Sequence, residues 1–229
     1  MKTNYVIDKH IEQLYNKGNT EFLLPNEYLS IKNKIKNREF SIYKPNIDSE
    51  KVILYRKNIP EVILLEIICK DKLRHQDILG SLFALNLAIN VYGDIIVGDD
   101  KYYIYVLPSI YNYIKSNLTM IGNNSVELVE RDIDLLNNYI RKLENFEIIV
   151  SSLRIDNVIS AITGLSRSGV IDKIKNKEIL LNYNVLNNNS YNLRENDIFS
   201  VRKYGKYKYN QIIKYTKKNN LIISYSRYI

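Results

Sequence analysis

The strongest constraint on the fold is the order in which strand and helix patterns follow one another between residues 62 and 130. A continuous apolar run predicts a buried strand, and the apolar spacing after it predicts a helix. Two short runs around Gly98 predict a β-hairpin, and a helix beginning at Pro108 and an alternating strand complete the series. The six elements cover residues 62–68, 75–88, 95–97, 102–107, 108–115 and 125–130. This order predicts a split βαβ, ferredoxin-like sheet.

Two tyrosines of the fourth element allow two interpretations. Tyr103 and Tyr105 are two residues apart, so they share one face of their strand. On an open sheet face they could stack RNA bases, as the aromatic residues of RRM domains do. On a covered face they are core residues, which is the more frequent case for tyrosines in sheets.

The flanking segments define the domain organisation. Two helices over residues 5–15 and 22–36 are expected before a strand at 52–55, and a connecting helix is expected over 134–145. We therefore expect an α+β chain with three parts. These are an N-terminal α/β segment over 1–60, a ferredoxin-like (RRM-like) domain over 61–148 and a further small domain over 149–229.

Positive charge is concentrated at the C-terminal end. Residues 1–150 hold 19 Lys and Arg against 20 Asp and Glu, whereas residues 151–229 hold 14 against 5 and so carry a net charge of +9. This asymmetry predicts a C-terminal domain that binds a polyanion. The alternative is a basic solvated surface without a partner, which is disfavoured because like charges repel one another.

Several classes of protein are excluded by the residues that are missing or scarce. One cysteine, Cys69, permits no intrachain disulfide, and two histidines, His10 and His75, are too few for a zinc site. Glycine-rich phosphate loops, HExxH and GxSxG are absent from the sequence. An apolar leader and a membrane-spanning stretch are also absent, so we expect a cytoplasmic protein without a cofactor or a metal.

Two short helices are predicted at the start of the basic region. Ile155, Val158, Ile159 and Ile162 form an apolar stripe, and Gly164 ends that helix. Ser166 is placed to cap a second helix, with Arg167 at its first position. Lys173 and Lys177 would share a face of this helix, so an anion could meet cations and a helix N-terminus there.

An alternating segment follows at residues 205–209. Lys206 and Lys208 share one strand face, and Tyr207 and Tyr209 share the other. The segment is either an edge strand with solvated lysines and inward tyrosines, or a phosphate-binding strip with stacking aromatic rings.

Four ordered motifs in this region resemble those of the S4 RNA-binding domain. They are Leu153-Arg154-Ile155-Asp156, Leu165-Ser166-Arg167-Ser168, Leu181-Asn182 and residues 195–202. The chain as a whole resembles the YlmH-type family of S4-domain proteins, through residues 22–25, 75–80, 93–97, 150–154 and 216–218. Lys177 departs from the family pattern, which has glycine there, and Ala88-Ile89 replaces a basic pair.

The resemblance implies which residues face RNA and which order the module. Asp156 and Asp197 would order the module through local hydrogen bonds. By the resemblance, the residues that face RNA are Arg154, Ser166, Arg167, Lys173 and Arg202. We expect five further residues to contact RNA as well, namely Lys177, Asn182, Lys203, Lys206 and Lys208.

The resemblance also implies a function. It implies a noncatalytic protein that binds rRNA of the large ribosomal subunit and tRNA after translation has stalled, and we expect a monomer. An RNA-modifying enzyme that uses the S4 module for substrate delivery is the first alternative, although residues 1–150 offer no catalytic motif. A cell-division adaptor is the second.

Overall fold

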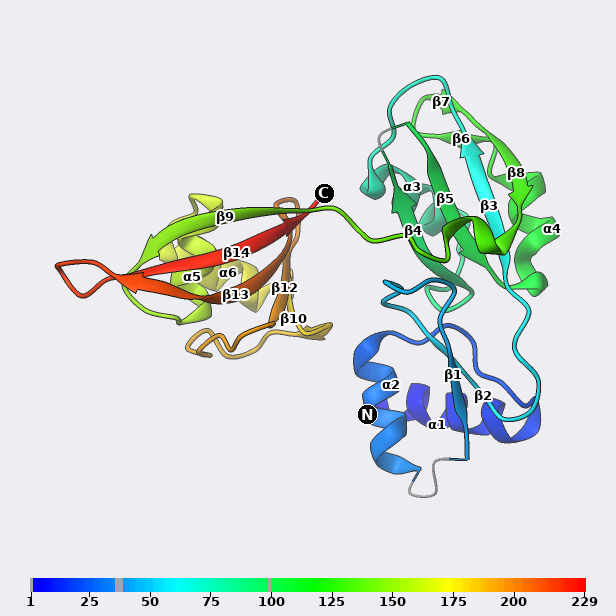
Figure 1. The fold of residues 1–229 in the computed structure, drawn as a ribbon, viewed down its shortest axis with the longest axis horizontal. Coiled ribbons are helices and arrows are strands. Elements are labelled where there is room, and N and C mark those ends of the chain that lie inside the picture. The colour runs from blue at the N-terminus through cyan, green and yellow to red at the C-terminus, as the bar shows by residue number, and fades with distance from the viewer. Residues whose placement is uncertain (1, 36–38, 99) are drawn as a thin grey trace. The chain divides into compact units, whose positions relative to one another are not determined.

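The computed structural model describes residues 2–35, 39–98 and 100–229, and it divides the chain into two compact units. Unit 1 comprises residues 1–140 and unit 2 comprises residues 141–229 (Figure 1). Both units combine helices with antiparallel sheets, as the α+β prediction requires. The domain boundaries predicted at 60/61 and 148/149 stay predictions.

Unit 1 begins with two helices and a small hairpin. Helix α1 spans Lys2–Asn16, α2 spans Pro25–Lys34, and strands β1 (Ser41–Tyr43) and β2 (Ile53–Tyr55) pair antiparallel. Pro25 occupies the first turn of α2, where its missing N–H leaves no helix hydrogen bond unmade. Apolar side chains of the helices and β2 form a small core of their own, comprising Ile7, Leu14, Leu23, Ile31, Ile35, Val52 and Leu54.

The predicted series of six elements is present in the rest of unit 1. The elements are β3 (Ile63–Ile68), α3 (His75–Ala84), β4 (Tyr92–Val97), β5 (Tyr102–Val106), α4 (Pro108–Asn117) and β8 (Glu127–Arg131). The strands form one antiparallel sheet in the order β4-β5-β3-β8. Strands β6 (Met120–Ile121) and β7 (Asn124–Ser125) add a short hairpin before β8. Helix α3 ends four residues earlier than predicted, since Asn86 adopts a left-handed conformation with φ of 55°.

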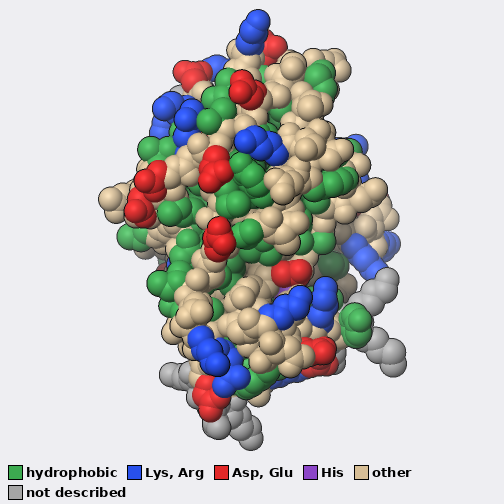
Figure 2. All heavy atoms as spheres, turned by 90° about the vertical axis from the view of Figure 1, so that its right-hand side faces the viewer, with side chains coloured by type: hydrophobic (Ala, Val, Ile, Leu, Met, Phe, Trp, Pro, Cys, Tyr) green, Lys and Arg blue, Asp and Glu red, His purple; other side chains and the backbone are tan. Residues whose placement is uncertain are grey.

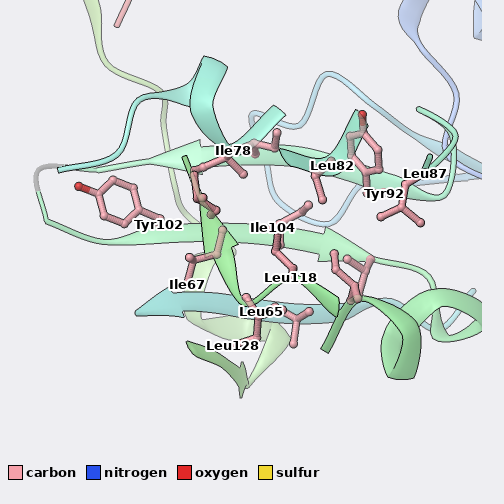
Figure 3. Packing of buried hydrophobic residues seen from close by; sticks show 14 of the residues in the cluster. Leu65, Ile67, Ile78, Leu82, Leu87, Tyr92, Tyr102, Ile104, Leu118 and Leu128 are labelled. Carbon is pink, nitrogen blue, oxygen red and sulfur yellow. The ribbon is translucent and has the colours of Figure 1, made fainter. Parts of the chain in front are cut away.

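One face of this sheet packs against the helices. Leu65, Ile67 and Ile104 of the sheet meet Ile78 and Leu82 of α3 in a single buried cluster (Figure 3). Each of these five side chains is at most 1% exposed. Burial of such side chains stabilises the fold by about 1.5–3 kcal/mol each.

The opposite face of the sheet is covered as well, by the N-terminal segment. Tyr103 and Tyr105 pack in a second buried cluster with Phe22 and Ile53. Tyr105 is fully buried, and its hydroxyl accepts a hydrogen bond from Asn46 Nδ2 at 3.0 Å. The interpretation of these tyrosines as an open RNA-stacking surface is therefore wrong, because Phe22, Ile53 and residues after β8 cover the face that an RRM domain leaves free.

Gly93 shows how closely the N-terminal segment approaches the sheet. A Cβ atom at Gly93 would lie 2.9 Å from ring carbons of Phe22 and 2.9 Å from Cβ of Tyr105. Any larger residue would therefore require Phe22 or Tyr105 to shift.

The prediction of a connecting helix over residues 134–145 is wrong. A 3-10 turn spans Ile133–Leu136, and strand β9 then runs from Leu143 to Val150. Strand β9 pairs along its whole length with β14 (Leu221–Tyr228), a partner more than 70 residues away that local spacing does not reveal. The apolar stripe is also discontinuous, since Leu135 and Ile140 are 55% and 71% exposed.

Unit 2 is a six-stranded antiparallel sheet with two helices. Its other elements are α5 (Ile155–Thr163), α6 (Arg167–Lys175), β10 (Ile179–Leu181), β11 (Asn184–Val185), β12 (Ile198–Val201) and β13 (Gly205–Tyr215). The strand order is β11-β10-β12-β13-β14-β9.

The core of unit 2 joins the helices to one face of the sheet. The predicted stripe of α5 is buried through Ile155, Val158 and Ile159, and Val170 and Ile174 of α6 pack beside it. An aromatic row crosses four strands on this face, with Phe199 stacked on Tyr207 at 5.5 Å between ring centroids and Phe146 stacked on Tyr225 at 5.5 Å. Tyr207 and Tyr209 are 5% and 2% exposed, so their interpretation as RNA-stacking rings is wrong and the inward interpretation is confirmed.

The two units differ in charge. Residues 141–229 hold 16 Lys and Arg against 7 Asp and Glu, so unit 2 carries a net charge of +9 and unit 1 carries −1. The face drawn in Figure 2 shows basic and acidic side chains intermixed among apolar ones. Among the helices of the described residues, none is both long enough and apolar enough to cross a membrane.

Candidate nucleic-acid interface

The first part of the predicted site lies at the start of α5, where a short strand-like segment leads into the helix. Leu153 O accepts from Leu193 N, and Ile155 N donates to Tyr191 O, so residues 153–155 are fixed against residues 191–193. Arg154 occupies the N-cap position of α5. The start of the helix is therefore held by pairing with a distant part of unit 2.

Asp156 orients the side chain of Arg154. The Asp156 carboxylate is 3% exposed and accepts from Arg154 Nε at 3.1 Å, from Arg154 Nη2 at 2.8 Å and from Asn157 N at 2.8 Å. These hydrogen bonds from Arg154 lower the pKa of Asp156, and the nearby charge of Arg167 lowers it further. The Arg154 side chain remains 42% exposed. Asp156 thus orders the module, as the resemblance implied, and it uses two of the five donors of Arg154.

Arg167 reaches the same region from the start of α6. The predicted N-cap is confirmed, since Ser166 Oγ accepts from Gly169 N at 3.1 Å. Ser166 also shares a hydrogen bond of 2.9 Å with Ser168, and both serines and Arg167 are exposed. Arg154 thus contacts the buried carboxylate directly, and the charge of Arg167 at the start of α6 acts on the same carboxylate.

The second part of the site is organised by Glu178. Lys173 Nζ donates to Glu178 Oε2 at 2.7 Å, and Arg202 Nη1 lies 4.0 Å from Glu178 Oε1. Lys173, then Arg202 and Lys203, lower the pKa of Glu178. The Lys173 side chain is 16% exposed and also lies 5.4 Å from the centroid of the Tyr204 ring, whereas Arg202 is 71% exposed. Lys173 is thus largely buried in contacts within the fold, whereas Arg202 and Lys203 are accessible to solvent.

Lys177 is not on the face of α6 that was predicted for it. Helix α6 ends at Lys175 with Asn176 as its C-cap, and Lys177 follows in the left-handed conformation with φ of 58°. The prediction that Lys173 and Lys177 share one face of α6 is therefore wrong, because the helix ends before Lys177. The glycine that the family has at this position fits that conformation without a steric cost.

Asn182 supports the turn after β10. Its Nδ2 donates to Asp197 Oδ1 at 2.8 Å, and its Oδ1 accepts from Ile198 N at 2.9 Å. Asn182 and Tyr183 both have positive φ, as the central residues of a tight hairpin turn require. Both ends of the Asn182 amide are thus used within the protein.

Lys206 and Lys208 point to the other side of the sheet. The register pairs Phe199 with Tyr207 on the helix side and Ser200 with Lys206 on the outer side. Lys206 and Lys208 therefore lie on the outer face of the sheet, apart from the predicted RNA residues at the helix starts and at the β12–β13 turn. Sequence patterns missed Tyr183 and Tyr228, whose rings contact Lys206, and Arg141, which lies over the Tyr228 ring. These residues come from separate segments of the chain.

Comparison with known proteins adds independent information. Residues 61–135 match the family described as "Putative RNA-binding domain in YlmH". The chain is 28% identical over 153 residues to the ribosome-associated protein quality control protein P2 of Bacillus subtilis (strain 168), an alignment that covers 67% of this chain and 60% of the relative. The chain therefore spans about 60% of the length of that relative.

A solved structure, the cell division protein ylmH from Streptococcus pneumoniae, is 19% identical with a TM-score of 0.49, covering 60% of this chain and 93% of that chain. The matched family is described as an RNA-binding domain, and the Bacillus relative is named as ribosome-associated. Neither is named as an enzyme. The resemblance to the YlmH-type family that the sequence motifs predicted is confirmed, with residues 61–135 as the part that matches the family's RNA-binding domain.

Proposed function

We propose that the chain is a noncatalytic RNA-binding protein in which unit 2 is an S4-type module. The module would bind structured rRNA of the large ribosomal subunit, and the complete protein would act with tRNA on stalled ribosomes in the cytoplasm. The proposal is supported by the four S4-like motifs, by the charge of +9 on unit 2 and by similarity to a ribosome-associated protein of Bacillus subtilis.

The observation that carries the proposal is the arrangement around Asp156. This buried carboxylate holds Arg154 in a bidentate pair, and its pKa is also lowered by the charge of Arg167 at the start of α6. Backbone N–H groups at a helix start favour anions, and an arginine with a fixed guanidinium loses little freedom when it binds phosphate. The helix starts of unit 2 are therefore suited to the phosphate groups of a folded RNA.

Arg202 and Lys203 extend this surface at the β12–β13 turn. Both are exposed, and Lys203 adopts a positive φ of 73° in the turn. Their contacts would be to the RNA backbone, which positions a protein without reading sequence. Selectivity would then come from the shape of the assembled RNA.

The ferredoxin-like middle domain would provide a further contact. Both faces of its sheet are covered, so RNA would have to meet its helices, loops or edge strands β4 and β8. Two weak contacts on one rigid RNA add through effective concentration, so modest surfaces can give a tight complex.

The test is binding of the full chain to purified large ribosomal subunits over a range of salt concentrations. We expect the double variant Arg167→Gln/Arg202→Gln to bind at least tenfold more weakly. The slope of log affinity against log salt should fall by about 1.8, or about 0.9 for each lost phosphate contact. The stability of this variant should change little, since both side chains are exposed.

The matched control is Lys9→Gln/Lys57→Gln, which removes two exposed charges outside residues 61–135 and outside unit 2. The control should bind like the parent protein. Equal affinity and equal salt dependence of all three proteins would contradict the proposed surface.

A further inference from the structure

The outer face of the unit 2 sheet, opposite α5 and α6, carries a second group of basic and aromatic side chains. Lys206 and Lys208 alternate with Tyr207 and Tyr209, which are buried in the core. The strand register places Ser200 opposite Lys206 and Ser226 opposite Lys208. The two lysines therefore project away from the helices and from the Arg154–Arg167 surface.

Lys206 lies between two tyrosine rings. Its Nζ is 4.8 Å from the ring centroid of Tyr183 and 4.6 Å from that of Tyr228, and it donates to the Tyr183 hydroxyl at 3.3 Å. The guanidinium of Arg141 lies 5.6 Å from the centroid of the same Tyr228 ring. We call these four residues, Arg141, Tyr183, Lys206 and Tyr228, the outer-face row.

The row is built from distant parts of the chain. Arg141 precedes β9, Tyr183 lies in the β10–β11 turn, Lys206 is in β13 and Tyr228 ends β14. All four side chains are half-buried, so each is held by the fold and still reaches solvent. Cations held over rings in this way are fixed before any ligand arrives, which lowers the entropy lost on binding.

Neutral polar groups continue the face beside the row. Ser226 Oγ donates to Asn145 Oδ1 at 2.6 Å, and Asn210 Nδ2 donates to Ser226 Oγ at 2.9 Å. Glu147 is the acidic residue that β9 presents on this side, and its register partner is Ser224, four positions from Tyr228. The carboxylate is thus displaced toward the other end of the strands.

We propose that the outer-face row binds an unpaired RNA segment, at a site separate from the helix starts. Proteins that bind single-stranded RNA combine cations for the backbone with aromatic rings on which bases stack, and the row supplies both in alternation. Unpaired bases can leave their own stack to meet tyrosine rings, whereas paired bases cannot. The inference rests on the RNA-binding function proposed above and adds a class of RNA and a second surface to it.

The test uses the full chain and two fluorescent RNA probes, a dodecamer of uridine and a fully paired hairpin. Arg141→Gln/Lys206→Gln removes the two cations of the row, and Lys9→Gln/Lys57→Gln is the control of equal charge. We expect the first variant to bind oligouridine about tenfold more weakly, with a salt slope reduced by about 1.4, or about 0.7 for each lost contact to a single strand. Its affinity for the hairpin should change less than about threefold, because phosphate contacts at the helix starts remain.

A second pair of variants tests the rings. Tyr228→Phe keeps the ring and should bind oligouridine like the parent, whereas Tyr228→Leu should weaken binding about tenfold, within the range measured for loss of one stacked base. Thermal unfolding of both variants shows whether the fold is retained. Oligouridine carrying 4-thiouridine should crosslink to peptides that contain Tyr183 or Tyr228.

The outcomes separate this inference from the proposed function. Normal oligouridine binding by Arg141→Gln/Lys206→Gln would overturn the inference, and such a face would then be open to a protein partner instead. Loss of hairpin binding in Arg167→Gln/Arg202→Gln would still support the helix-start surface in that case. Conversely, if Arg167→Gln/Arg202→Gln binds the hairpin as tightly as the parent protein, the proposed helix-start surface is contradicted. Oligouridine binding alone then decides whether the row binds RNA.

Discussion

Asp156 accepts two hydrogen bonds from the guanidinium of Arg154, from Nε at 3.1 Å and from Nη2 at 2.8 Å, although Asp156 itself is only 3% exposed. A buried carboxylate needs such partners, and this one also accepts from the backbone N–H of Asn157. The same contact therefore stabilises the start of α5 and fixes the orientation of an arginine that reaches solvent.

Asp156→Ala should lower the free energy of unfolding by about 1–3 kcal/mol, because its hydrogen bonds to a charged side chain and to the backbone are lost. RNA affinity should fall too, since Arg154 is no longer oriented. Urea denaturation and RNA binding measure the two effects. Asp172→Ala, which removes an exposed acidic residue of α6, is the control and should leave both nearly unchanged.

The same pair predicts part of the acid sensitivity of unit 2. The folded pKa of Asp156 is lowered, so its stabilising effect is complete above the unfolded value of about 3.8 and is lost as the pH falls through the lower folded value. The difference in stability between the parent and Asp156→Asn should therefore shrink below pH 4. A difference that stays constant down to pH 2 would show that the ion pair has no such effect.

Lys173 and Arg202 should behave differently although both contact Glu178. Lys173→Glu places a second carboxylate beside Glu178 in a partly buried position and should cost about 1–2 kcal/mol of stability. Arg202→Glu changes a side chain that is 71% exposed and should leave the melting temperature nearly unchanged while weakening RNA binding. Equal melting temperatures for the two variants would contradict the assignment of Lys173 to the fold.

Lys177→Gly should stabilise the protein by about 0.5–1 kcal/mol, because glycine adopts the left-handed conformation after α6 without the steric cost that lysine has there. Lys177→Ala removes the charge but keeps the Cβ, so it should not stabilise. Urea denaturation of the two variants separates the backbone effect from the loss of charge.

Tyr105 should limit stability at high pH. Burial raises the pKa of Tyr105 to about 12, so the folded protein keeps a proton that the unfolded chain loses near pH 10. Stability from this residue is present below pH 10 and is lost as the pH rises through about 12. Tyr105→Phe should show a weaker loss of stability over that range, measured by urea denaturation at increasing pH.

Local patterns in the sequence predicted the elements whose partners lie close by. The apolar stripe of α5, the Ser166 cap and the series of six elements in unit 1 are all present, because spacing and capping act within a few residues. The alternation of Lys206 and Lys208 with Tyr207 and Tyr209 correctly separated two faces of β13.

Long-range pairing is what the sequence did not reveal. The predicted helix over residues 134–145 includes the first three residues of β9, because the pairing of β9 with β14 at the other end of unit 2 is not visible in local spacing. Tyr103 and Tyr105 could not be assigned to a covered face without knowing that Phe22 packs on them. The outer-face row depends on the same distant pairings, so no single segment of the sequence contains its pattern.

The proposed function requires that the protein bind the large ribosomal subunit and perform no chemistry on it. Gradient fractionation of cells, with and without a drug that stalls translation, tests this most directly when the fractions are probed for the full chain. We expect the parent protein to migrate with the large subunit, and a larger share of it to do so after stalling. The variant Arg167→Gln/Arg202→Gln should be found in the free fractions. Finding the parent protein in the free fractions under both conditions, or finding an RNA modification that disappears when the protein is deleted, would contradict it.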